Sequence, residues 1–481
     1  MPLKPRWVYA LAASGLLFAA PAAAEETWYS QAILVMAGDQ PLDTADGRTS
    51  RDGLWFEEEG RGHAAPIFYD WDKDGRRDLL VGGFSGRLRV YLNEGEDNDP
   101  VFSGYDWIRA GGGLAMVRNF CCVATGLRMA DINGDGIDDL TIGHYAPGLI
   151  FWYKGLEDGF AERRTLTDLD GVPILTRLDV VSEDSTSSLA AKPTWMDWDG
   201  DGDLDIVLGD LRGDLVVRFN HGEQIAEGIT VVEGQPVFSR HRPVFSREAW
   251  IEMGISPERA EELSTRQSDQ QFSIFGLIEG GGGPLTHEKY LSPKAADWDQ
   301  DGLTDLLVGT QAGAVYWLRN TGVQGDPEFA APEVLLAPPA GGAHHYSLID
   351  ETGKPERGHR LSLDVADYNG DGKPDLIVGD YLRSLRLRSD LTPEERSAFG
   401  DLEAQLLAFD RRAGIEIEGL AFWDRITAHQ TVLSDGSPLR AELLELEQAA
   451  FRYLEPSRPE RGEDWSRYLK EHGNVWVYLR K

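Results

Sequence analysis

The sequence has little cysteine and little positive charge. Only 2 of its 481 residues are cysteine, and 47 lysines and arginines face 81 aspartates and glutamates, giving a formal net charge of −34. Two cysteines cannot build a disulfide-rich scaffold. The acidic balance argues against nucleic acid as a partner, because its recognition requires a basic surface. After the first 24 residues, no apolar run approaches the roughly 20 residues of a transmembrane helix.

The composition is that of a folded, exported protein. Hydrophobic residues make up 41% of the chain, which suffices for a buried core. Lys4 and Arg6 precede an apolar stretch that ends near Ala20, and three alanines then precede Glu25. This pattern is typical of a secretory signal peptide over residues 1–24. We therefore expect residues 25–481 to form the mature protein in the periplasm or outside the cell.

An acidic nonapeptide, D-x-[DN]-x-D-G-x-x-D, occurs five times, at residues 70–78, 131–139, 197–205, 297–305 and 367–375. Each copy carries four short oxygen-bearing side chains and a glycine at position 6. Calcium prefers six to eight hard oxygen ligands on a loop that can curl around the ion, and glycine permits the sharp turn. The repetition therefore predicts calcium sites, up to five ions in all.

The residues after each loop predict strands. An EF-hand loop would carry glutamate at position 12 and continue into a helix. Position 12 is apolar in every copy: Val81, Ile142, Leu208, Val308 and Val378. Short β-branched runs that end in glycine are typical of strands. The loops recur roughly every 60–70 residues, with one gap of about 100, and this period fits one four-stranded propeller blade per repeat.

These repeats resemble the FG-GAP or VCBS repeats of secreted bacterial proteins and of integrin α-subunit propellers. The resemblance implies a calcium-binding β-propeller that serves in adhesion or ligand binding. It also implies ligands at loop positions 1, 3, 5 and 9 and the backbone carbonyl at position 7. The implied metal ligands are Asp70, Asp72, Asp74, Arg76, Asp78, Asp131, Asn133, Asp135, Ile137, Asp139, Asp197, Asp199, Asp201, Asp203, Asp205, Asp297, Asp299, Asp301, Leu303, Asp305, Asp367, Asn369, Asp371, Lys373 and Asp375.

We expect an all-β fold, a single propeller domain with five blades. Seven blades is the alternative, if degenerate repeats lie at 26–60 and 225–290. Closure is expected from residues 475–479 pairing within the fifth blade, with the stretch 53–59 supplying its remaining strands. Insertions are expected at about 236–280 and, with helical character, at 390–472, where Thr392 and Glu395 form a capping-box pattern.

Three further features leave alternatives open. Cys121 and Cys122 are adjacent, so they form either a vicinal disulfide or two reduced core thiols. The aromatic residues at loop position 2, Trp71, Trp198, Trp298 and Tyr368, favour packing between blades over sugar stacking. Histidines that precede the loops, including His63 and His359, could line a funnel on one face or be solvated loop residues.

Two functions remain, and no catalytic residue set is recognised. The first is a non-catalytic, calcium-binding module for an extracellular glycan or protein. The second is a polysaccharide-acting enzyme, lyase-like, in which bound calcium neutralises a uronate carboxylate.

Overall fold

Each acidic loop connects the first and second strands of an antiparallel sheet. The computed structural model describes residues 28–45, 49–54, 62–117, 124–145, 148–168, 173–176, 189–220, 236, 238, 271–339, 346–349, 356–414, 439–456, 465–468 and 470–481. Residues 1–24, Cys121 and Cys122, and most of the predicted insertion at 236–280 lie outside these ranges, so the signal peptide and the vicinal disulfide stay predictions.

Four blades each consist of four consecutive strands along the chain. The first contains β4 (Ala65–Tyr69), β5 (Asp78–Gly82), β6 (Leu88–Tyr91) and β7 (Asp106–Trp107); the second contains β10 (Ala124–Ala130), β11 (Asp139–His144), β12 (Ile150–Tyr153) and β15 (Arg164–Thr165). The third contains β16 (Lys192–Met196), β17 (Asp205–Gly209), β18 (Leu215–Arg218) and β19 (Gln271–Ser273); the fourth contains β20 (Ser292–Ala296), β21 (Asp305–Gly309), β22 (Val315–Leu318) and β23 (Glu333–Leu336).

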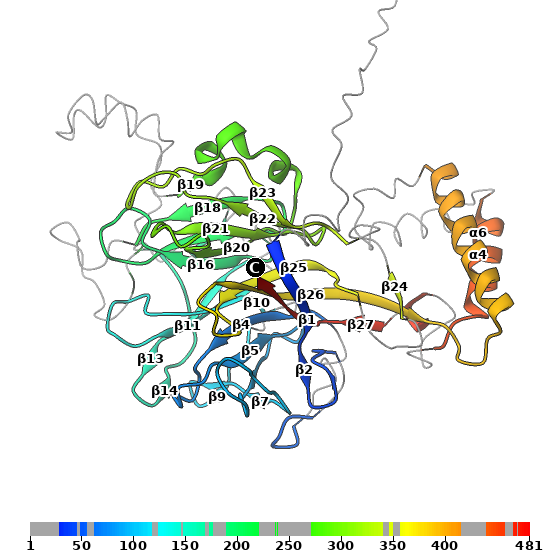
Figure 1. Ribbon diagram of the computed structural model, residues 1–481, viewed down its shortest axis with the longest axis horizontal. Coiled ribbons are helices and arrows are strands. Elements are labelled where there is room, and N and C mark those ends of the chain that lie inside the picture. Colours follow the sequence, from blue (N-terminus) through cyan, green and yellow to red (C-terminus); the bar gives the residue numbers. More distant parts are fainter. Residues whose placement is uncertain are drawn as a thin grey trace, which may run out of the picture.

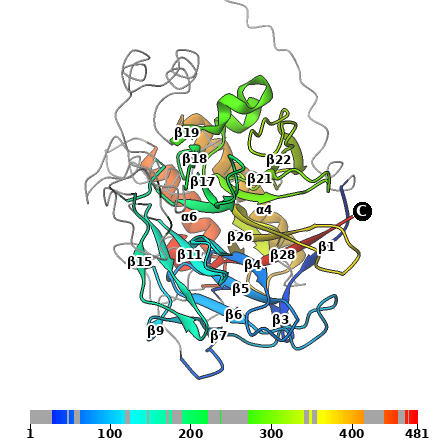
Figure 2. The same cartoon turned by 90° about the vertical axis from the view of Figure 1, so that its left-hand side faces the viewer.

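The fifth blade joins the two ends of the described chain. Its strands are β25 (His359–Ala366), β26 (Asp375–Arg386), β28 (Val475–Arg480) and β1 (Tyr29–Leu34), and β1 pairs antiparallel with β28. The two lie side by side near the C-terminus (Figure 2). Pairing of 475–479 within this blade is confirmed. The expectation that residues 53–59 complete the blade is wrong, because β1 takes the outer position; Gly53 and Leu54 lie outside any strand.

The blades form a closed ring. The inner strand β4 packs beside β10, β10 beside β16, β16 beside β20, and β20 beside β25, which returns to β4 (Figure 1). Five buried apolar clusters lie between successive blades, one at each of the five interfaces. The ring therefore has five blades, and the seven-bladed alternative is wrong.

Loop position 2 packs between blades, as the sequence predicts. Trp298 is fully buried in the cluster between the fourth and fifth blades, and Trp198 lies in the one between the third and fourth. Trp71 stacks on Phe160 with ring centroids 5.6 Å apart, and Tyr368 packs against the cluster that joins the fifth blade to the first. Each loop is thus anchored to the next blade by its second residue.

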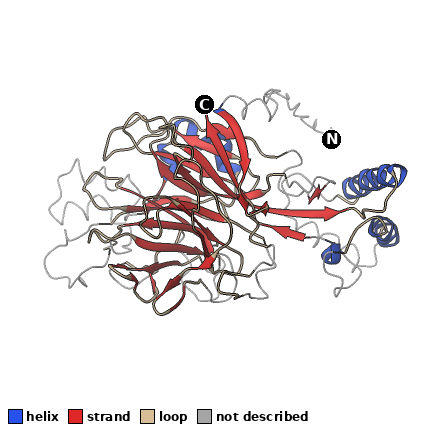
Figure 3. Cartoon of the chain, turned by 60° about the horizontal axis from the view of Figure 1, so that its bottom comes forward, coloured by secondary structure: helices blue, strands red, loops and turns tan. Residues whose placement is uncertain are grey.

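A helical extension stands apart from the ring. Strand β26 runs past the blade, where it pairs with β27 (Lys470–His472) and β24 (Tyr346–Ile349). Beyond this ribbon, α4 (Pro393–Arg412), α6 (Arg440–Phe451) and α7 (Trp465–Tyr468) share a separate apolar cluster with Leu385 (Figure 3). Thr392 and Glu395 make both hydrogen bonds of the predicted capping box.

The remaining elements are short. Hairpins are formed by β2 (Met36–Ala37) with β3 (Gln40–Pro41), β8 (Arg109–Ala110) with β9 (Gly113–Leu114), and β13 (Gly155–Leu156) with β14 (Gly159–Phe160). The 3-10 helices η2 (Ile274–Leu277) and η3 (Glu279–His287) follow β19. Among the described helices, none combines the length and apolar character needed to cross a membrane.

Candidate metal centre

The aspartate at position 9 fastens every loop to its blade. One of its oxygens accepts the backbone N–H of position 2 at 2.8–3.3 Å, and the other accepts, at 2.7 Å, an N–H at or just beyond the end of the next strand of the blade. The donor pairs are Trp71 and Asn93 for Asp78, Ile132 and Gly155 for Asp139, Trp198 and Asn220 for Asp205, Trp298 and Asn320 for Asp305, and Tyr368 and Arg480 for Asp375. This residue therefore has a structural role that does not require a metal.

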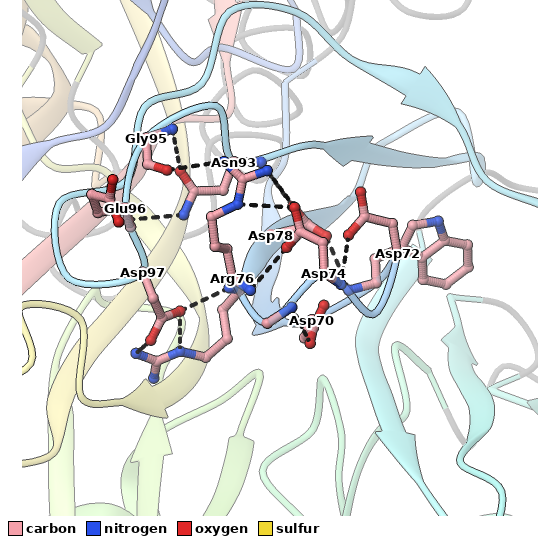
Figure 4. A network of polar contacts seen from close by, with 12 residues as sticks. Asp70, Asp72, Asp74, Arg76, Asp78, Asn93, Gly95, Glu96 and Asp97 are labelled. Carbon is pink, nitrogen blue, oxygen red and sulfur yellow. Dashed lines mark hydrogen bonds and ion pairs between the residues drawn. The ribbon is translucent and has the colours of Figure 1, made fainter.

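The rest of the loop curls around its own acidic side chains. In four loops the first aspartate accepts the N–H of the position-6 glycine at 2.7–3.1 Å. That glycine has φ between +84° and +98° in all five loops, a conformation that disfavours other residues. The position-5 carboxylate accepts the N–H of position 7 at 2.9–3.1 Å. Figure 4 shows the first loop, with Asn93 beside Asp78.

Three loops bring carboxylates together as a metal would require. The groups are Asp70, Asp72 and Asp78; Asp197, Asp199 and Asp205; and Asp297, Asp299 and Asp305, and in each the ligand oxygens lie within 4.8 Å of one another. Two oxygens on one calcium ion can be no further apart than twice the metal–oxygen distance, about 4.6–5.2 Å. Positions 1, 3 and 9 of these loops could therefore share one metal ion.

Two carboxylate oxygens of these loops lack a hydrogen-bond partner among the described residues. Asp70 Oδ1 and Asp299 Oδ1 are buried without a hydrogen bond within the described structure. A buried, unpaired carboxylate oxygen is costly, and a hard cation would satisfy it. The donor set fits calcium, since every side-chain ligand is oxygen.

The other predicted ligands are placed differently. In the second and fifth loops, position 3 is Asn133 or Asn369, so these loops offer one carboxylate fewer. Position 5 is absent from the three groups among the described residues. In three loops it faces a cation instead: Asp74 pairs with Arg76, Asp135 with Lys154 at 2.8 Å, and Asp301 with Arg319 at 3.5 Å. Coordination by position 5 and by the position-7 carbonyls stays a prediction.

The position-9 carboxyls are electrostatically costly without a cation. Burial raises the pKa of Asp205 to about 8 and that of Asp139 to about 6, and the neighbouring loop carboxylates push in the same direction. Burial also raises the pKa of Asp78, Asp305 and Asp375. The two N–H groups that each carboxyl accepts favour its ionised form. A cation in the loop would favour that same form.

A second polar cluster lies at the other end of the inner strands. His63 Nε2 lies 2.6 Å from the Tyr290 hydroxyl, and Lys192 Nζ lies 3.7 Å from the centroid of the Tyr290 ring. Among the histidines that precede the loops in the sequence, His63 and His359 are buried, His287 is exposed, and His344 and His345 lie outside the described residues. Lys192 and Tyr290 were not predicted, since each is a single residue in one repeat.

A hydrogen-bonded serine, histidine and aspartate lie beside the fifth blade. His472 Nδ1 is 2.6 Å from Asp43 Oδ2, and His472 Nε2 is 2.7 Å from Ser384 Oγ. The order is that of a nucleophile, a base and an orienting acid. All three side chains are buried, with exposures of 2% for Ser384, 7% for His472 and 6% for Asp43. In this conformation they tie the N-terminal segment to β26 and β27.

Comparisons with known proteins agree with the fold. A family model for FG-GAP-like repeats matches residues 70–142 and 297–378, which include four of the five loops. No curated protein sequence gives a significant match.

Solved structures give distant matches. One is an Agrocybe aegerita lectin that recognises non-reducing terminal N-acetylglucosamine, at 18% identity over 66% of this chain and 60% of the lectin, with a TM-score of 0.31. Others are the Photorhabdus luminescens Tc holotoxin pore, at 15% identity over 69% of this chain, and the TcdB2-TccC3-Cdc42 complex, at 16% over 65%, with TM-scores of 0.26 and 0.25. The chain spans only 15% and 13% of those toxin chains. The repeat matches and the ring of blades agree with each other: the chain carries FG-GAP-like repeats at residues 70–142 and 297–378, and its fold is a five-bladed β-propeller.

Proposed function

We propose that the protein is an exported, calcium-binding propeller that acts as a non-catalytic binding module for an extracellular glycan or protein. The observation that carries the proposal is the convergence of three carboxylates within 4.8 Å in each of three loops. Exported proteins meet millimolar calcium, so loops that bind at about 10⁻⁴–10⁻³ M would be filled there. Calcium then offsets part of the acidic charge and stiffens one face of the ring.

Equilibrium dialysis against radioactive calcium tests the metal. We expect up to five ions for each chain, and a melting temperature that falls when a chelator removes them, because binding to the folded state alone stabilises it. The variant Asp72→Asn, Asp199→Asn, Asp299→Asn should bind fewer ions. This change leaves asparagine where the second and fifth loops already have it, so the fold should tolerate it. Wild-type protein that binds no calcium would contradict the proposal.

Incubation with acidic and neutral polysaccharides tests the role. We expect calcium-dependent retention of at least one glycan, or of a protein partner, with chain length unchanged. Unsaturated, shortened products would instead support the lyase-like alternative.

A further inference from the structure

The blades of a propeller surround a central channel, and the inner strands place one residue from each of several blades at the end opposite the acidic loops. The residue seven positions before each loop begins is His63, Ala190, Tyr290 or Arg360 in four of the blades. Ala190, Tyr290 and Arg360 have φ of +54°, +57° and +54°, in the left-handed region that favours glycine. The same turn therefore recurs at the equivalent position of three blades, and it presents a different side chain in each. We call His63, Lys192, Tyr290 and Arg360 the channel mouth.

The cations in and below the mouth exceed the carboxylates that pair with them. Lys192 on β16 and Arg128 on β10 are buried, and the charges of Arg128 and Arg360 add to burial in lowering the pKa of Lys192. Asp364 is the nearby acid, but it is engaged: its Oδ1 lies 2.6 Å from Lys294 Nζ, and its Oδ2 accepts the Phe68 N–H at 2.8 Å. Buried charge without a partner is expensive, and here it occurs in a protein whose net charge is −34.

Several donors in this region are left without acceptors. The Nε atoms of Arg128 and Arg360 and the Nδ1 atom of His63 are buried and lack a hydrogen-bond partner within the described structure. Lys192 donates to Leu361 O and Ser362 Oγ, each at 3.1 Å, so it is held in place. Burial lowers the pKa of His63, which favours the neutral ring and a hydrogen bond from the Tyr290 hydroxyl to Nε2. Nδ1–H is then a further donor.

Unpaired hydrogen-bond donors together with excess positive charge are the features of an anion-binding site. A guanidinium is planar and matches a carboxylate with two parallel hydrogen bonds. The negative field of the whole protein opposes multiply charged ligands more than singly charged ones. Arg360 is only partly buried, so it marks the side from which a ligand can approach. The aromatic ring of Tyr290 supplies an apolar wall beside the charges.

We propose that the channel mouth binds the carboxylate of a small, singly charged organic acid, with the Arg360 guanidinium and the His63 Nδ1–H as the main contacts, Lys192 held behind them and the Tyr290 ring beside them. This site lies away from the acidic loops and is independent of whether they hold calcium.

Calorimetric titration and thermal melting of the calcium-loaded protein test the site with three probes: acetate, glucuronate and glucose. We expect both acids to bind and to raise the melting temperature, and glucose to do neither. Tighter binding of glucuronate than of acetate would identify a sugar acid as the source of the carboxylate. Equal binding of the two would identify a free small acid as the source.

Arg360→Gln should weaken acid binding at least tenfold. Lys192→Met should do the same and provides a second variant should the first not fold. The matched control is Arg388→Gln, which removes an exposed arginine paired with Asp390 on the helical extension and should leave affinity unchanged. Acids that bind no better than glucose, or an Arg360→Gln protein that binds them like wild type, would overturn the proposal.

Discussion

Buried charge is arranged differently at the two ends of the inner strands: it is negative and hydrogen-bonded at the loop end, and positive with few acceptors at the channel mouth. Strand β16 runs from Lys192 at the channel mouth to Met196, directly before the acidic loop at Asp197, a length of about 16 Å at ~3.3 Å per residue. At the loop end, carboxylates are held by backbone N–H groups, and the arrangement is repeated in every blade. At the mouth, different cations from single blades gather with few acceptors. The loops thus combine a structural role with a candidate metal site, whereas the mouth is organised around charge that the fold does not neutralise.

The largest loss of stability is expected in the acidic loop at 197–205, where two substitutions can distinguish the structural role of position 9 from the proposed metal-binding role of position 3. Asp205→Asn places an amide group against the N–H of Trp198 or Asn220, so we expect it to lower the free energy of unfolding by about 3 kcal/mol in calcium and by about 1–2 kcal/mol in chelator. Asp199→Asn should cost about 1 kcal/mol in calcium and less than about 0.5 kcal/mol in chelator. Urea unfolding under both conditions measures this.

Equal losses for the two variants in chelator would show that position 9 does not fasten the loop. The comparison is well matched because both changes convert aspartate to asparagine within the same nonapeptide, and asparagine already occupies position 3 of two other loops.

A smaller effect is expected at Asp43, which lies with His472 beside the fifth blade. Burial would raise the pKa of Asp43, but the hydrogen bond and charge of His472 and the N–H groups of Gly473 and Ala45 outweigh it and lower the pKa from 3.8 to about 2. A lowered pKa contributes stability above the unfolded value, and this is lost as pH falls through the folded one. Asp43→Asn should therefore cost about 2 kcal/mol at pH 7.

The difference between Asp43→Asn and wild type should shrink as pH falls from about 4 toward 2, which unfolding curves at several pH values measure. Asp390→Asn, in an exposed ion pair with Arg388, should show little change at any pH. A pH-independent difference for Asp43→Asn would mean that the carboxylate charge is not what stabilises the segment.

The same contrast explains what the sequence could predict. Each acidic loop carries its carboxylates within nine residues, so the candidate metal centre, the strand that follows and the number of blades could all be predicted from one repeated pattern. For the mouth, the sequence offered only His63, as one of the histidines that precede the loops; its contact with Tyr290 could not be predicted, because the two are 227 residues apart and meet only when the ring closes. The closing strand was missed for a related reason: residues 29–34 pair with β28 from the opposite end of the chain, and nothing local marks them as its partner.

The smallest change in the free energy of unfolding is expected at the channel mouth, and it should be a gain in stability, whereas the other substitutions cause a loss. Lys192 is fully buried, its nearest charged neighbours are cations, and burial lowers its pKa well below the usual value. Replacing a buried charge by an apolar side chain of similar length is often neutral or stabilising. Without added acids, Lys192→Met should therefore raise the free energy of unfolding by up to about 1 kcal/mol, whereas the loop substitutions lower it. A clear loss of stability in urea unfolding would mean that the hydrogen bonds of Lys192 to Leu361 and Ser362 stabilise the fold. Buried charge would then be stabilising at both ends of the inner strands.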